Sequence, residues 1–142
     1  MRVTFKKAHP DALLPSYGSA LASGLDVISV EDMDIRPNEV KAIDTGLILS
    51  FLDPDYEIQV RPRSGNTLKR LFTVSNSPGT IDADYRGQIK VLIHLIGPEK
   101  ITIKKGDKIA QLVVCPIVRV KVDWDEIVAT ERGGAGFGST GG

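Results

Sequence analysis

A segment bracketed by glycines, GTIDADYRG at residues 79–87, combines two acids with a tyrosine and an arginine. Asp82 or Asp84 could act as a general base on a water molecule, and Tyr85 could position a polar ring. The same residues would also suit a plain turn in which each aspartate accepts hydrogen bonds from its own backbone. Asn76, shortly upstream, carries both the donor and the acceptor atoms that recognition of a planar base requires.

A second segment, RPRSGNTLKR at residues 61–70, holds four basic residues and no acid. Arg63 could clamp a phosphate bidentately, Ser64 offers a hydroxyl at the start of a short helix expected over 64–71, and Gly65 lets backbone approach a ligand closely. The segment therefore predicts a local anion site. A capped surface helix with a solvated basic face is the alternative, and composition alone does not decide between them.

Two later segments are less specific. In GDKIAQ at 106–111, Asp107 is typical of a turn, whereas Gln111 interrupts an apolar strand and therefore lies at a sheet edge or reaches a ligand. From residue 133 to 142, six of ten residues are glycine. With Arg132 and Phe137, this tail could form a flap that wraps phosphates and stacks on a base. A disordered tail is the alternative.

Composition narrows the class of protein. The chain has 142 residues, with 18 basic and 18 acidic side chains, so no global field attracts nucleic acid or an acidic membrane. One cysteine excludes a disulfide framework, and two histidines are few for a common zinc site. No apolar run approaches the roughly 20 residues that span a bilayer, and no signal peptide is apparent. We therefore expect a cytoplasmic protein that binds neither nucleic acid nor membrane.

The elements that must position these residues are short strands. Eight prolines and fourteen glycines separate β-branched runs of strand length, and residues 64–71 alone suggest a helix. We expect an all-β, jelly-roll-like barrel or sandwich over residues 1–131, with one short helix, and a flexible glycine-rich tail over 132–142. The expected strands cover residues 25–28, 46–51, 56–60, 89–95, 109–114 and 117–120.

Taken in order, five segments resemble the five motifs of the trimeric dUTPase family. They are ASGLDV at 22–27, RPRSG at 61–65, GTIDADYRG at 79–87, GDKIAQ at 106–111 and RGGAGFGSTG at 132–141. The resemblance implies a homotrimer that hydrolyses dUTP to dUMP and diphosphate with Mg²⁺. Such an enzyme limits uracil incorporation into DNA and supplies dUMP for thymidylate synthesis. The family's sites lie at subunit interfaces, where the tail of one chain closes over a site built by two others.

The resemblance also implies roles for individual residues. Asp82 matches the aspartate that activates water for attack at the α-phosphorus, and Tyr85 matches the residue that packs beneath the deoxyribose. Asp26 matches an acid that supports the metal through water. The remaining matches are Asn76, Thr80 and Ile81 for uracil, Arg63, Ser64, Gly65 and Gln111 for phosphate, Lys90 bordering the ligand, and Arg132, Phe137 and Gly138 in the flap.

The sequence departs from the family pattern at a few positions. Asn66 and Thr67 stand where apolar residues are common, and Ala135 stands where glycine is frequent. Two alternative functions remain. A dCTP deaminase of similar fold would need a glutamate near the base, where this chain has Asp82. A catalytically silent nucleotide-binding module would bind dUTP without turnover.

Overall fold

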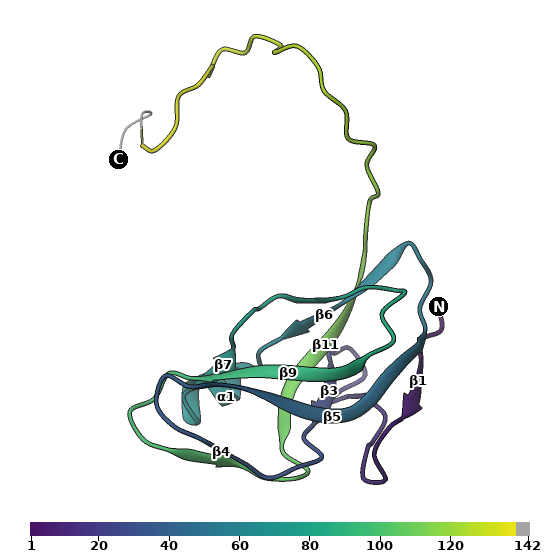
Figure 1. Ribbon diagram of the computed structural model, residues 1–142, viewed down its shortest axis with the longest axis vertical. Helices are drawn as coiled ribbons and strands as arrows, with labels where there is room; N and C mark the ends of the chain where they lie inside the picture. Colours follow the sequence, from purple (N-terminus) through teal and green to yellow (C-terminus); the bar gives the residue numbers. More distant parts are fainter. Residues whose placement is uncertain (139–142) are drawn as a thin grey trace.

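The computed structural model describes residues 1–138, and most of that length is strand and turn (Figure 1). The only helix among these residues is α1 (Ser64–Lys69). The strands are β1 (Thr4–Lys7), β2 (Ser16–Tyr17), β3 (Leu25–Ile28), β4 (Met33–Ile35), β5 (Val40–Phe51), β6 (Tyr56–Arg61), β7 (Phe72–Val74), β8 (Gly79–Ile81), β9 (Gln88–Leu95), β10 (Ile101–Ile103) and β11 (Lys108–Pro116). The predicted all-β class with one short helix is confirmed.

The strands form three antiparallel sheets. A four-stranded sheet has the order β1-β5-β9-β7, and a five-stranded sheet has the order β2-β3-β11-β6-β8. Strands β4 and β10 pair separately as a two-stranded sheet. Strands that are distant in sequence, such as β3 and β11, are therefore neighbours in space. This topology brings the segments at 22–27, 61–65 and 106–111 to one region of the molecule.

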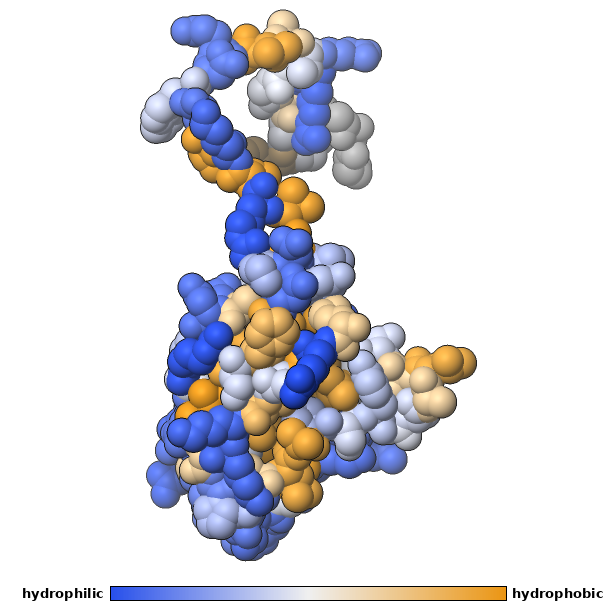
Figure 2. Space-filling model, turned by 90° about the vertical axis from the view of Figure 1, so that its right-hand side faces the viewer, coloured by the Kyte–Doolittle hydropathy of each residue, from blue (hydrophilic) through white to orange (hydrophobic). Residues whose placement is uncertain are grey.

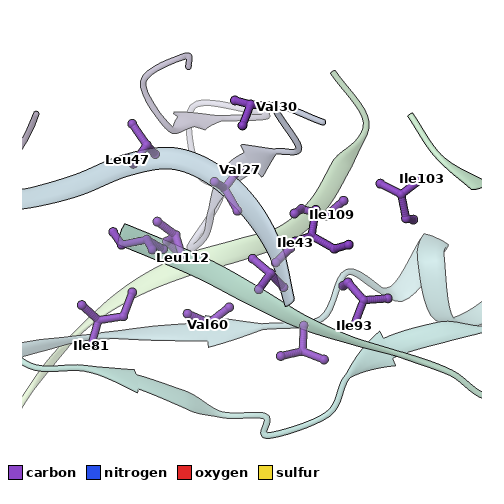
Figure 3. Close-up of a cluster of buried hydrophobic side chains, with 14 of the residues drawn as sticks. Val27, Val30, Ile43, Leu47, Val60, Ile81, Ile93, Ile103, Ile109 and Leu112 are labelled. Carbon is purple, nitrogen blue, oxygen red and sulfur yellow. The ribbon is translucent and has the colours of Figure 1, made fainter. Parts of the chain in front are cut away.

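The core lies between the two larger sheets, and strand alternation explains which side chains enter it. Along β9, Ile89, Val91, Ile93 and Leu95 are all buried, as their period of two predicts. Figure 3 shows such side chains from both sheets pointing toward one another. Each fully buried aliphatic side chain contributes roughly 2 kcal/mol relative to exposure. This packing holds the strands that carry the polar residues on their outer faces.

The short helix ends earlier than predicted. It covers Ser64–Lys69, Arg70 is its C-cap, and Leu71 has a positive φ of 56°. The backbone N–H groups of Ile96 and Gly97 both donate to the Leu71 carbonyl, which fixes this turn. Tertiary hydrogen bonds therefore end the helix before the apolar residue that extended its sequence pattern.

The prediction of a core strand over residues 117–120 is wrong for this chain. Val118 and Val120 are 87% and 72% exposed, and the segment from 117 to 138 leaves the sheets as an extended hook (Figure 1). The alternating valines suit a strand, but a strand needs a neighbour to accept its hydrogen bonds. At the start of this segment, the Ile117 N–H donates a hydrogen bond to the Asp55 carbonyl. Figure 2 shows apolar side chains along the hook.

Candidate functional site

The basic segment and the turn at 106–111 share one pocket, which we call the Arg63 pocket. Its volume is about 350 Å³. Five residues predicted from the sequence line it, from three separate segments of the chain. The lining residues are Gly18, Ser19, Ala22, Gly24, Asp26, Arg63, Ser64, Gly65 and Gln111.

Asp26 is the acidic centre of this pocket. Its side chain is only 13% exposed, and each carboxylate oxygen faces a different cation. Arg63 Nε lies 2.8 Å from Oδ1, and Lys108 Nζ lies 2.8 Å from Oδ2. Two positive charges around one negative charge leave the pocket locally positive, which favours an anionic ligand.

Gln111 lies on a central strand, since β11 pairs with both β3 and β6. The edge interpretation of this residue is therefore wrong, and its side chain lines the Arg63 pocket instead. Its Nε2 donates to the Pro62 carbonyl at 2.9 Å and so holds the loop that carries Arg63. A Cβ at Gly24 would lie 2.2 Å from Gln111 Oε1, so any larger residue there would displace the Gln111 side chain.

The hairpin residues form a second pocket of about 520 Å³, which we call the Tyr85 pocket. Tyr85 donates from its hydroxyl to the Gln88 carbonyl at 3.2 Å. Gly87 makes room for this ring, since a Cβ there would lie 2.2 Å from Tyr85 Oη. The pocket is lined by Ala42, Val60, Asn76, Gly79, Thr80, Ile81, Tyr85, Gln88, Ile89, Lys90 and Leu92. All the predicted base-reading residues, and Lys90, are among them.

Asp82 does not line the Tyr85 pocket. It follows β8 in an exposed turn, where the Tyr85 N–H donates to the Asp82 carbonyl. With Asp84 and Arg86 it lines a third pocket of about 520 Å³ beside β6 and the start of the hook. The two aspartates thus lie in a turn and not along an extended segment.

The predicted flap residues lie in the hook. Arg132 Nε donates to the Ala135 carbonyl, and the Phe137 side chain is fully exposed. Gly138 has a φ of 83°, which suits glycine. Neither Arg132 nor Phe137 lines the Arg63 or Tyr85 pocket. Residues 139–142 of the predicted flap lie outside the described residues.

Two residues that support the Arg63 pocket, Lys108 and Asn66, were not predicted as site residues from the sequence. Lys108 contacts Asp26, and its carbonyl accepts a hydrogen bond of 2.9 Å from Asn66 Nδ2. Asn66 is buried, and this bond gives its amide a partner at a position where the family commonly has an apolar residue. A lysine after a Gly-Asp turn is typical of a solvated position. Only the pairing of β3 with β11 reveals its partner.

The fit of this site to a metal ion depends on Asp26. Among residues 1–138, no group of three or more His, Cys, Asp or Glu side chains could hold a metal. A carboxylate has about four lone-pair positions, so Asp26 can face two cations and still accept from a metal-bound water. Mg²⁺ on a triphosphate takes most of its ligands from phosphate and water. The residues therefore fit an indirect role for Asp26.

Comparisons with known proteins agree with the geometry. A family model described as dUTPase matches residues 11–141. Deoxyuridine 5'-triphosphate nucleotidohydrolases of Nautilia profundicola and Clostridium kluyveri are 47% and 49% identical to this chain, over 99% of both chains in each case. A G164S mutant dUTPase of Staphylococcus bacteriophage 80alpha, solved with dUpNHpp, superposes with a TM-score of 0.85 at 26% identity. That match covers 99% of this chain and 98% of the phage chain.

No helix among the described residues is long and apolar enough to cross a membrane.

Proposed function

Since the chain belongs to the dUTPase family, we propose that it hydrolyses dUTP to dUMP and diphosphate. The observation that carries the proposal is the pair of preformed pockets. One is cationic and carries hydroxyl and amide groups, and the other joins an amide side chain to an aromatic ring on a tight hairpin. These are the chemistries that a triphosphate and a pyrimidine deoxynucleoside require. Removing dUTP limits uracil in DNA and supplies dUMP for thymidylate synthesis.

Asp82 is the general base in this proposal. Its carboxylate takes a proton from a water molecule, whose oxygen attacks the α-phosphorus as the bond to the bridging α-β oxygen breaks. The products are dUMP and diphosphate. Arg63, Ser64 and Gln111 hold the phosphates in line for this attack. Asp26 would support a bound Mg²⁺ through a water molecule, and the metal would supply neutralisation of phosphate charge.

The Tyr85 pocket selects the nucleoside. The side chain of Asn76 and the backbone of Thr80 and Ile81 read the donor and acceptor pattern of uracil, which differs from that of cytosine. The Tyr85 ring packs beneath the deoxyribose and leaves no room for a 2′-hydroxyl. Lys90 borders the same pocket.

We further propose a homotrimer with sites at subunit interfaces. In one chain the Arg63 and Tyr85 pockets are separate, Asp82 lines neither, and the flap residues lie in the hook. A site that combines these groups is built by two chains and closed by the tail of a third, residues 132–142. A cytoplasmic location stays a prediction.

Replacing Asp82 by asparagine tests the proposal. Asp82→Asn keeps the size of the side chain but removes the base, so kcat falls by about 10²- to 10⁴-fold. Calorimetric titration with a non-hydrolysable dUTP analogue should still show binding. Asp84→Asn, in the same turn, is the matched control and keeps most of the activity. An unchanged kcat in Asp82→Asn would remove Asp82 as the base.

A panel of deoxynucleoside triphosphates separates this function from its rivals. We expect diphosphate from dUTP and no ammonia from dCTP. Ammonia release from dCTP would instead identify a deaminase. Tight dUTP binding in Mg²⁺ without turnover would identify a silent binding module.

A further inference from the structure

Lys108 reaches the Arg63 pocket without lining it. The residue begins β11, and its ammonium group lies 2.8 Å from Asp26 Oδ2, on the carboxylate whose other oxygen faces Arg63. The pocket itself is lined by Asp26, Arg63 and Gln111, but not by Lys108. Lys108 therefore does not contact a ligand confined to this pocket, and the pocket residue that it touches is Asp26.

The position of Lys108 restricts how Arg63 pairs with Asp26. An arginine beside a carboxylate with two free oxygens commonly forms two parallel contacts, which use two of its nitrogens. Here Lys108 occupies Oδ2, and Arg63 approaches Oδ1 through Nε. The guanidinium has five N–H donors, one on Nε and four on its terminal nitrogens. Pairing through Nε thus leaves the terminal nitrogens for another anion.

The backbone of Lys108 is held in place, as its ammonium group is. Its carbonyl accepts from Asn66 Nδ2 at 2.9 Å, and Asn66 belongs to α1, the helix that follows Arg63. The neighbouring Asp107 pairs with Arg70 at 2.8 Å, at the other end of the same helix. The lysine is therefore tied by its backbone to the element that carries Arg63, and by its side chain to the partner of Arg63.

We propose that Lys108 is a positioning residue for phosphate binding. By occupying Asp26 Oδ2, it keeps Arg63 in single contact with Asp26 and presents the terminal guanidinium nitrogens to the triphosphate. Without Lys108, Arg63 closes onto both carboxylate oxygens and withdraws a donor from the substrate. This inference rests on the proposed role of Arg63 as a phosphate ligand.

The first test compares substitutions at Lys108 in the full-length protein. Lys108→Met should raise KM for dUTP by about tenfold, the loss expected for one charge-assisted hydrogen bond, with a smaller change in kcat. Lys108→Arg should restore KM, because a guanidinium also occupies Oδ2. Lys104→Met is the matched control: it removes the same charge from the same turn, but Lys104 pairs distantly with Asp32 at 3.9 Å. An equal rise of KM in Lys104→Met would overturn the proposal.

The second test asks whether Lys108 acts through Arg63. Arg63→Gln alone should raise KM, and adding Lys108→Met to it should raise KM no further. Full additivity of the two effects would overturn the positioning role while leaving Arg63 as a phosphate ligand. An unchanged KM in Arg63→Gln would instead refute the phosphate role of Arg63, and the proposal with it. If Lys108→Met fails to fold, Lys108→Gln enters the same comparison.

Discussion

Gly87 matters because of the ring that lies over it. A Cβ at this position would approach Tyr85 Oη to 2.2 Å, so Gly87→Ala must displace the tyrosine. Since Tyr85 is proposed to exclude a 2′-hydroxyl, its displacement should let UTP compete. We expect the ratio of kcat/KM for dUTP to that for UTP to fall by about tenfold. A variant with the original ratio and an unchanged fold would show that Tyr85 does not discriminate the sugar.

Asp107 links stability to pH. Burial alone would raise its pKa, but the Lys104 N–H and the Arg70 guanidinium outweigh burial and hold the pKa below its ordinary value of 3.8. A carboxylate with a lowered pKa stabilises the fold above its unfolded-state pKa, and this stability is lost as the pH falls through the folded-state pKa. At neutral pH, Asp107→Asn should cost about 1 kcal/mol of unfolding free energy.

Urea unfolding at several pH values checks the sign of this effect. The difference between the wild-type protein and Asp107→Asn should be largest at neutral pH and shrink below pH 3.8. A difference that stays constant down to the acid limit would mean that the charge of Asp107 contributes nothing.

Candidate site residues could be identified from the sequence where a side chain is unusual for its neighbours in the chain. Gln111 interrupts an apolar run, and Asn76 stands before a glycine-bracketed turn, so both could be singled out. Lys108 could not, because a lysine beside a turn is ordinary. Its meaning depends on Asp26, which lies 82 positions earlier (108 − 26) and becomes a neighbour only when β3 pairs with β11.

At the scale of elements, the sequence pattern located the longer strands and the short strand β3, but it missed most of the other short strands. Residues 56–60 and 89–95 fall within β6 and β9 because their alternation is set by one buried face. The strands β4 and β8 have three residues each, too few to show a period. They form because longer neighbours supply hydrogen-bond partners, which is tertiary information.

The helix α1 depends on one buried amide. Asn66 Nδ2 donates to the Lys108 carbonyl, so Asn66→Ala leaves a part-buried acceptor without this donor. Such a loss costs about 1–3 kcal/mol. Thermal unfolding should show a lower Tm for Asn66→Ala, whereas Lys69→Ala, on the exposed face of the same helix, should change little. Equal Tm values for the two variants would mean that the amide does not anchor the helix.

At the scale of the whole molecule, the hook (residues 117–138) exposes apolar side chains that nothing in the described part of the single chain covers. Between residues 118 and 128 its apolar side chains are at least 72% exposed, and they follow one another along a single segment. Monomers rarely expose contiguous apolar patches of more than a few hundred Å². In the proposed trimer these side chains are covered by neighbouring chains. They are Val118, Val120, Val122, Trp124, Ile127 and Val128.

Trp124 can report on this cover, because it is the only tryptophan of the chain and is 99% exposed in the single chain. If the hook packs on a neighbouring chain, the emission maximum of Trp124 in the native protein should lie at a shorter wavelength than in the urea-unfolded protein. Light scattering should then give three times the chain mass of 15.4 kDa. Dilution that dissociates the trimer should change the Trp124 emission and the particle mass together, because the same contacts bury Trp124 and hold the trimer. A particle of 15.4 kDa with the emission of solvated tryptophan would contradict the trimer and its shared sites.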